Sequence, residues 1–451
     1  MRALRNWKEV TLFSLIVLSP RKGILFVAGL LATVICLLAF KFDPPNEVIF
    51  YAGAVLGALL SLYQLYFDYF KPPRLTFEPP RDLKLEILAK LMPSKMECLP
   101  TWSQPVEGAF KVVPDCSGEP ALIRSDNFDR ELRSGRWNPK LVVSVDRRKE
   151  VYAAVRSANA EEKIAILRAK ANQANRLEKD FFNEDKIGIA SPIESGADVE
   201  IFKSCYYITF LTNELATTVA ISTPESGPPE YFLGGEVADR FPAKRTGSDK
   251  FQLGDFGEYL MGDHLGANII AITKDDQMCL WQQGGGAIFS DGLLAPTGSG
   301  SCQWRDFDPH NPSLIATAKR GMLREFKEES VFSGAFKRKH SVHYEAHVIG
   351  FFRNLARAGL PGFVGIIKVD INASELQPDV REVVDPTRLG RTVRFPAGNC
   401  AELEASVDSL LNSADKHRGL SIPLIACLHS LRAALRECDS RIASILAWNP
   451  P

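Results

Sequence analysis

Two long apolar segments near the N-terminus constrain this chain more than any other feature. They are Ile24–Phe40 and Val48–Phe67, and only Lys41–Glu47 separates them. Neither segment contains a charged residue. As helices rising about 1.5 Å per residue, each approaches the roughly 30 Å thickness of a bilayer's hydrocarbon core. The sequence therefore predicts a two-helix transmembrane hairpin within residues 24–70, preceded by a cytoplasmic segment at residues 1–23.

The charges that flank these segments predict the orientation of the hairpin. Basic residues precede the first segment and follow the second, whereas the turn between them holds only Lys41. Because basic residues favour the cytoplasmic side, both termini are expected there. A cleaved secretory signal fits less well, since the first apolar stretch is long, no small-x-small cleavage site follows Phe40, and a second segment comes at once.

Small residues recur at every fourth position of the second segment, at Gly53, Gly57 and Ser61. Such a stripe lets two helices approach closely in a membrane. Two interpretations stay open at this point. The stripe serves either packing within one hairpin or association of several hairpins around a pore.

The composition limits the function classes that suit the rest of the chain. Basic and acidic residues number 54 each, so the charge excess typical of general nucleic-acid binders is missing, and we expect no binding to DNA or RNA duplexes. The nine cysteines are scattered without a C-x-x-C pair, which argues against a disulfide scaffold or a structural zinc site. The chain is long enough for a membrane part followed by one or two globular cores.

Residues 71–265 are expected to form a linker and a mixed α/β region. Lys71-Pro72-Pro73 ends the second apolar segment, because proline lacks an amide donor and disfavours helix before it. An amphipathic helix is predicted from about Ala160 to Phe182, packed on a domain, since its pattern is too short for a coiled coil.

Beyond residue 265 the sequence predicts a hairpin, a glycine-rich loop and one conspicuous helix. Asn268–Thr273 and Gln277–Gln283 flank a turn and form the hairpin. The helix, Pro312–Ser330, contains Arg324-Glu325-Phe326-Lys327-Glu328-Glu329. Its glutamates stand at i, i+3 and i+4 and share one face, so a positive partner is needed among them.

Two partners suit this acidic face. Arg324 can bridge to Glu328, and a divalent cation such as Mg²⁺ can be held by Glu325, Glu328 and Glu329 while keeping coordination sites for phosphate. The alternative is a solvated face neutralised by nearby lysines and arginines. The preceding glycines favour a ligand, because they let phosphates approach the backbone. The candidate ligand-binding residues are Gly298, Gly300, Trp304, Arg305 and Arg324.

These motifs together resemble a Nudix domain, whose box is G-x5-E-x7-R-E-U-x-E-E-x-G-U with U a bulky aliphatic residue. Arg324, Glu325, Glu328 and Glu329 match the second half of this box. Phe326 and Phe332 stand at the U positions. The chain departs from the box at three other positions, where His310 replaces the first glycine, Ala316 the first glutamate and Val331 the last glycine. The resemblance implies a metal role for the glutamates, and it implies that two later strands complete an α/β/α sandwich.

The predicted hairpin and this domain together resemble the two-transmembrane NUDIX effectors of cyclic-oligonucleotide-based anti-phage signalling (CBASS). The resemblance implies a multi-pass protein of the bacterial inner membrane that senses a cyclic oligonucleotide, forms a homo-oligomer and permeabilises the lipid bilayer. The expected fold class is α/β. A Nudix-like sandwich at residues 266–398 follows the hairpin and the mixed region, and a helical segment at residues 399–451 ends the chain.

Three functions compete on this evidence. The first is a membrane effector that binds a cyclic nucleotide without necessarily cutting it, which loss of the box glutamate at Ala316 favours. The second is a membrane-anchored Nudix hydrolase of a nucleoside diphosphate derivative, which the retained Glu325, Glu328 and Glu329 keep open. The third is an anchored scaffold that binds no nucleotide. The degenerate box favours binding over catalysis, and no catalytic residue is assigned.

Overall fold

The structure is a computed structural model, and its described residues fall into two compact units. Described are residues 2–14, 75–78, 110–114, 120–157, 160–176, 181, 183–193, 197–217, 219–222, 230–231, 242–245, 251–282, 293–332, 344–379, 391–412 and 419–447. Unit 1 draws on residues 1–78, 152–183 and 219–234. Unit 2 draws on residues 79–151, 184–218 and 235–451 and contains the predicted Nudix-like region.

The described residues of unit 1 include helices α1 (Arg2–Phe13) and α7 (Ala160–Arg176), the end of α6 (Val145–Ser157) and a small sheet. Helix α1 packs on α7, and Asn6 donates a hydrogen bond of 2.8 Å to Asn175. The predicted apolar face of α7 is buried, at Ile164, Leu167 and Ala171 among others. The sheet has the order β1 (Leu75–Glu78), β7 (Val219–Ser222) and β8 (Glu230–Tyr231).

The expectation of an N-terminal transmembrane hairpin is corrected. Residues 24–40 and 48–67, and with them Gly53, Gly57 and Ser61, lie outside the described residues, and the hairpin is not seen. Within the described ranges no helix is long and apolar enough to cross a membrane. Helix α7 spans 17 residues, which is about 26 Å against the roughly 30 Å that a bilayer requires, and it is rich in charged side chains. The fold class is mixed α/β with several sheets.

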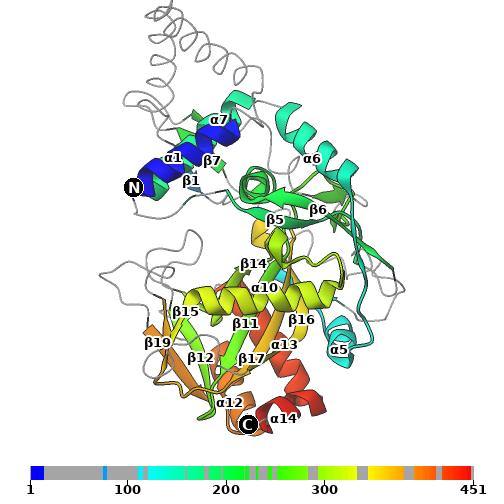
Figure 1. Cartoon of the computed structure of the whole chain (residues 1–451), viewed down its shortest axis with the longest axis vertical. Coiled ribbons are helices and arrows are strands. Elements are labelled where there is room, and N and C mark those ends of the chain that lie inside the picture. Colours follow the sequence, from blue (N-terminus) through cyan, green and yellow to red (C-terminus); the bar gives the residue numbers. More distant parts are fainter. Residues whose placement is uncertain are drawn as a thin grey trace, which may run out of the picture. The chain divides into compact units, whose positions relative to one another are not determined.

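A large sheet forms the centre of unit 2 (Figure 1). Its strands follow one another as β13 (Leu294–Ala295), β12 (Gln277–Gln282), β11 (Gly266–Ile272), β17 (Leu360–Val369), β16 (Tyr344–Asn354), β3 (Pro120–Ser125) and β2 (Phe110–Pro114). In addition, β14 (Gly298–Ser301) pairs with β11, and β19 (Arg391–Pro396) pairs with β12. The predicted hairpin is confirmed, because β11 and β12 are antiparallel with Ala271 opposite Cys279. Strands β11 and β17 run parallel.

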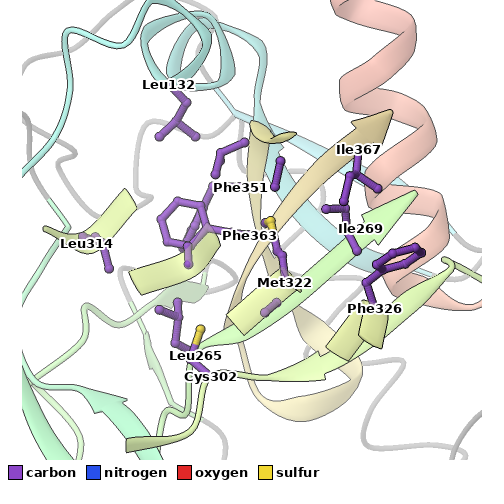
Figure 2. Packing of buried hydrophobic residues seen from close by; sticks show 14 of the residues in the cluster. Leu132, Leu265, Ile269, Cys302, Leu314, Met322, Phe326, Phe351, Phe363 and Ile367 are labelled. Carbon is purple, nitrogen blue, oxygen red and sulfur yellow. The ribbon is translucent and has the colours of Figure 1, made fainter. Parts of the chain in front are cut away.

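Helices cover both faces of this sheet because its strands are apolar on both sides. On one face Ile269 and Ala271 pack with Met322 and Phe326 of α10 (Leu314–Glu329), as Figure 2 shows for the labelled residues. On the other face the intervening residues of β11 pack with the C-terminal helices. These helices are α12 (Cys400–Asn412), α13 (Ile422–Arg436) and α14 (Ser440–Ala447). These three helices of the C-terminal segment thus share a hydrophobic core with the sheet.

Unit 2 contains further described helices and strands. The helices and helical turns are α5 (Asp126–Ser134), α6 (Val145–Ser157, which continues into unit 1), α8 (Tyr206–Thr209), Phe210–Glu214, Leu215–Thr217, Trp304–Asp306 and Leu355–Arg357. The strands are β4 (Leu141–Val143), β5 (Asp185–Ile189), β6 (Val199–Cys205), β9 (Ala243–Arg245), β10 (Phe251–Leu253), β15 (Ser330–Phe332) and β18 (Leu376–Pro378).

A buried aspartate is held by the π-helical turn at Phe210–Glu214. Asn213 of this turn donates a hydrogen bond of 2.8 Å to Asp263, whose side chain is buried. Burial raises the pKa of Asp263 to about 6, from an ordinary value of 3.8, although Asn213 and Arg353 act in the opposite direction. The folded protein therefore keeps a proton on Asp263 at pH values where the unfolded chain has released it.

We expect Asp263 to make the protein less stable as the pH rises from about 4 to about 6. In this range the folded state binds more protons than the unfolded state, so the free energy of unfolding falls with rising pH. Asp263→Asn keeps the acceptor for Asn213 and removes the titration. Urea denaturation across this pH range should show a shallower decline for the variant. An equal decline in both proteins would assign the pH dependence to other groups.

Candidate functional site

The candidate site lies on helix α10. Local sequence features explain where this helix begins and which of its faces is buried. Ser313 caps the helix, and its hydroxyl accepts a hydrogen bond of 3.0 Å from the amide of Ala316. Leu314, Ala318, Met322 and Phe326 recur at helical spacing and are fully buried. This fixes the rotation of the helix and directs Glu325, Glu328 and Glu329 away from the deepest core.

Strand β14 lies against the acidic side of α10 and supplies amide donors to it. The amide of Ser301 donates to Glu325 over 3.1 Å, and the amide of Ser299 donates to Glu329 over 3.2 Å. Four helical residues rise about 6 Å, and two strand residues rise about 6.7 Å, so the two spacings match. Two of the three glutamates therefore satisfy amides that the edge strand would otherwise leave unpaired.

The glycines of β14 permit this close approach. A Cβ atom at Gly298 would lie 2.6 Å from the amide nitrogen of Phe326, and one at Gly300 would lie 2.3 Å from the carboxylate carbon of Glu325. The sequence suggested a loop open to phosphates at these positions. The structure instead places both candidate residues in a strand whose side-chain positions are filled by α10.

Arg324 is the centre of a buried ionic cluster. Its guanidinium contacts Asp306 at 3.1 Å, Glu325 at 2.9 Å and Glu328 at 2.8 Å. It also donates a hydrogen bond of 2.7 Å to the carbonyl of Ser301. Burial lowers the pKa of Arg324, but these carboxylates outweigh the burial and raise it above its ordinary value. The predicted bridge to Glu328 is present, and Arg324 remains charged at every working pH.

Glu325 is the most buried of the three glutamates, with 8% of its surface exposed. Burial raises the pKa of Glu325, and the charges of Arg324 and Lys186 oppose that shift. The side chain of Lys186 is itself buried and pairs with Glu184 at 2.6 Å. Glu325 thus depends on Arg324 and on the amide of Ser301 to compensate for lost solvation.

The outer part of the site is more accessible. Arg305, 61% exposed, contacts Glu328, 40% exposed, at 2.7 Å. Trp304 is half-buried, packs against the core, and its ring lies 5.5 Å from that of Phe307. The structure therefore brings Arg305, Arg324 and the glutamates together, and Trp304 immediately precedes Arg305 in the same short helical turn.

The carboxylates of Glu325, Glu328 and Glu329 are not arranged to coordinate a Mg²⁺ ion. Glu325 and Glu329 accept strand amides, and Glu328 lies between two arginines. In the described part of the chain, no three His, Cys, Asp or Glu side chains are grouped so that they could hold a metal. A metal would require these ion pairs to open, and we derive no step through one. The Mg²⁺ suggested by the sequence stays a prediction.

Asp306 and Ser301 were missed by the sequence reasoning. Asp306 accepts from Arg324 and also from the amide of Gln303, at 2.8 Å, so it fixes the turn before α10. It stands next to Arg305 in the sequence, which was the one available signal. Asp306 and Arg324 are 18 residues apart in the sequence, so no local pattern predicts their contact.

Comparison of the chain with protein families and with curated proteins found no match.

Proposed function

We propose that unit 2 binds a nucleotide messenger, with a cyclic oligonucleotide as the expected class, and does not hydrolyse it at an appreciable rate. The proposal rests on the contacts that the glutamates of α10 already make. They are bound by Arg324, by Arg305 and by the amides of β14. The choice of a nucleotide rests on the resemblance to Nudix domains.

The physical argument concerns charge. Hydrolysis of a diphosphate in this type of site uses a metal to stabilise the charge that develops on the phosphoryl oxygens. Here Arg324 already pairs with Glu325 and Glu328, at 2.9 and 2.8 Å, and so occupies the position that a metal would need. A cation would compete with a guanidinium that makes several hydrogen bonds at once. This supports binding over turnover.

A second candidate is a Nudix hydrolase, and one observation favours it. Glu328 is 40% exposed and lies beside the exposed Arg305, so this pair can open without disturbing the core. Exposed ion pairs of this kind contribute only about 0–1 kcal/mol. A substrate phosphate that attracts Arg305 would free only the Oε1 atom of Glu328, because Oε2 keeps its contact of 2.8 Å with Arg324.

The test is binding and turnover by the full chain with linear and cyclic nucleotides, with and without Mg²⁺. We expect saturable binding of at least one cyclic nucleotide and negligible cleavage. The double variant Glu328→Gln with Glu329→Gln should leave the cleavage background unchanged. Glu150→Gln is the matched control, because Glu150 is an exposed glutamate that pairs with Arg147 at 3.5 Å.

Mg²⁺-dependent cleavage that the double variant abolishes would replace the sensor with the hydrolase. If no nucleotide binds, the anchored scaffold is the remaining function. The inner-membrane localisation, the homo-oligomer, the action on the bilayer and the role in anti-phage defence stay predictions, because the described residues do not bear on them.

A further inference from the structure

A cavity of about 130 Å³ lies within unit 2, at the opposite half of α10 from the acidic site. Segments far apart in the sequence line it: the end of α5, the first turns of α10, the middle of β16 and helix α14. Ile315 and Lys319 belong to α10, and Arg441 and Ile442 belong to α14. None of the residues proposed for nucleotide binding lines this cavity.

The walls of the cavity combine apolar and polar surface in similar shares. Trp137, Ile315, Val348, Ile442 and Ile445 are among its apolar lining residues. A dry cavity of about 150 Å³ with aliphatic and aromatic walls is large enough to bind benzene. This cavity is slightly smaller and partly open to solvent, so it has room for a single six-membered ring whose substituent extends outward.

The charged residues that line the cavity are all basic. They are Arg133, Lys319 and Arg441, and His347 lies beside them, whereas no acidic side chain lines the cavity. Arg133 is neutralised by Glu437 and Asp439, at 2.6 and 2.7 Å. Within the described part of the chain, the side chains of Lys319 and Arg441 form no ion pair, so two positive charges remain uncompensated at this cavity.

The guanidinium of Arg441 is held in place although, among the described residues, no carboxylate pairs with it. Its Nη2 atom donates a hydrogen bond of 2.8 Å to the carbonyl of Ser134. The same atom lies 2.8 Å from the position of a Cβ atom at Gly135, which ends α5 in the left-handed conformation with φ of 70°. Glycine at this helix end thus leaves room for the guanidinium. A preformed cation of this kind loses little conformational freedom when an anion binds.

We propose that this cavity binds a small ring compound that carries a phosphate monoester, with the ring between the apolar walls and the phosphate at Lys319 and Arg441. A phosphate monoester carries a charge of about −1.5 to −2 at neutral pH, which matches two free positive charges. Apolar side chains combined with convergent polar groups occur in small-molecule sites. This site is separate from the one in the proposed function and does not depend on it.

Phenyl phosphate is the probe, and its binding to the full chain is measured by calorimetry. We expect one saturable site, with inorganic phosphate and benzyl alcohol each binding at least about tenfold more weakly, because each lacks one of the two interactions. Lys319→Gln and Arg441→Gln should each raise the Kd about tenfold, which corresponds to about 1.4 kcal/mol. Lys149→Gln is the control, since Lys149 is 72% exposed and pairs with Asp146 away from the cavity.

Ile315→Trp, which fills the cavity from its half-buried wall, should abolish binding, and an unchanged urea midpoint shows that the variant is folded. Adenosine monophosphate, whose base is bicyclic, should not compete with phenyl phosphate, and competition at this site would overturn the inferred size of the ligand. The proposal is overturned if phenyl phosphate does not bind below about 10 mM. It is also overturned if Lys319→Gln and Arg441→Gln bind as the unaltered chain does.

Discussion

Replacing Arg324 by glutamine is expected to lower the free energy of unfolding by about 3–5 kcal/mol, the usual cost of leaving buried charges without their partner. The side chains of Arg324, Asp306 and Glu325 are 11%, 6% and 11% exposed, so water cannot take over the role of the guanidinium. Urea denaturation of the full chain, followed by tryptophan fluorescence, measures the loss.

Two further variants make this prediction specific. Arg305→Gln removes the same kind of group from the same Glu328, but Arg305 is 61% exposed. It should therefore change stability by less than about 1 kcal/mol. Adding Glu325→Gln to Arg324→Gln should recover part of the loss, because the uncompensated carboxylate is then gone. An equal loss for Arg305→Gln and Arg324→Gln would show that burial does not set the strength of this cluster.

The sequence predicted those parts of the site that depend on local periodicity. Helical spacing placed Glu325, Glu328 and Glu329 on one side of α10 and paired Arg324 with Glu328, as the contact of 2.8 Å confirms. Two apolar runs on either side of the polar turn Lys274-Asp275-Asp276 predicted the hairpin of β11 and β12. Both inferences need only residues a few positions apart.

Contacts between distant segments were not predictable in the same way. Strands β2 and β3 join the central sheet through β16, more than 200 residues later in the chain, and no single-sequence pattern encodes that pairing. Gly298 and Gly300 are equally ambiguous, since glycine suits both a loop that contacts phosphate and a strand that contacts a helix. The transmembrane hairpin was inferred from hydrophobicity and length alone, and the described helices do not include it.

Replacing Gly298 by alanine is expected to destabilise the protein by about 1–3 kcal/mol, as overpacking a tight contact usually does. The new Cβ atom would lie 2.6 Å from the amide nitrogen and 2.8 Å from the Cα atom of Phe326. These are backbone atoms in the last turn of α10, and they cannot rotate away as the end of a side chain can. On its other side, β14 pairs with β11, where Gly298 lies opposite Ile269, so β14 is held on both sides.

Gly398→Ala is the matched control for this substitution. A Cβ atom there would meet the carboxylate of Glu402 at 2.9 Å, the end of a flexible side chain that can move, so we expect a change below about 0.5 kcal/mol. The comparison also decides between two roles for Gly298. A large loss of stability assigns it to the packing of β14 on α10. A stable variant with weaker nucleotide binding would instead assign Gly298 to the ligand-binding residues. The added methyl group would then act by obstructing the ligand.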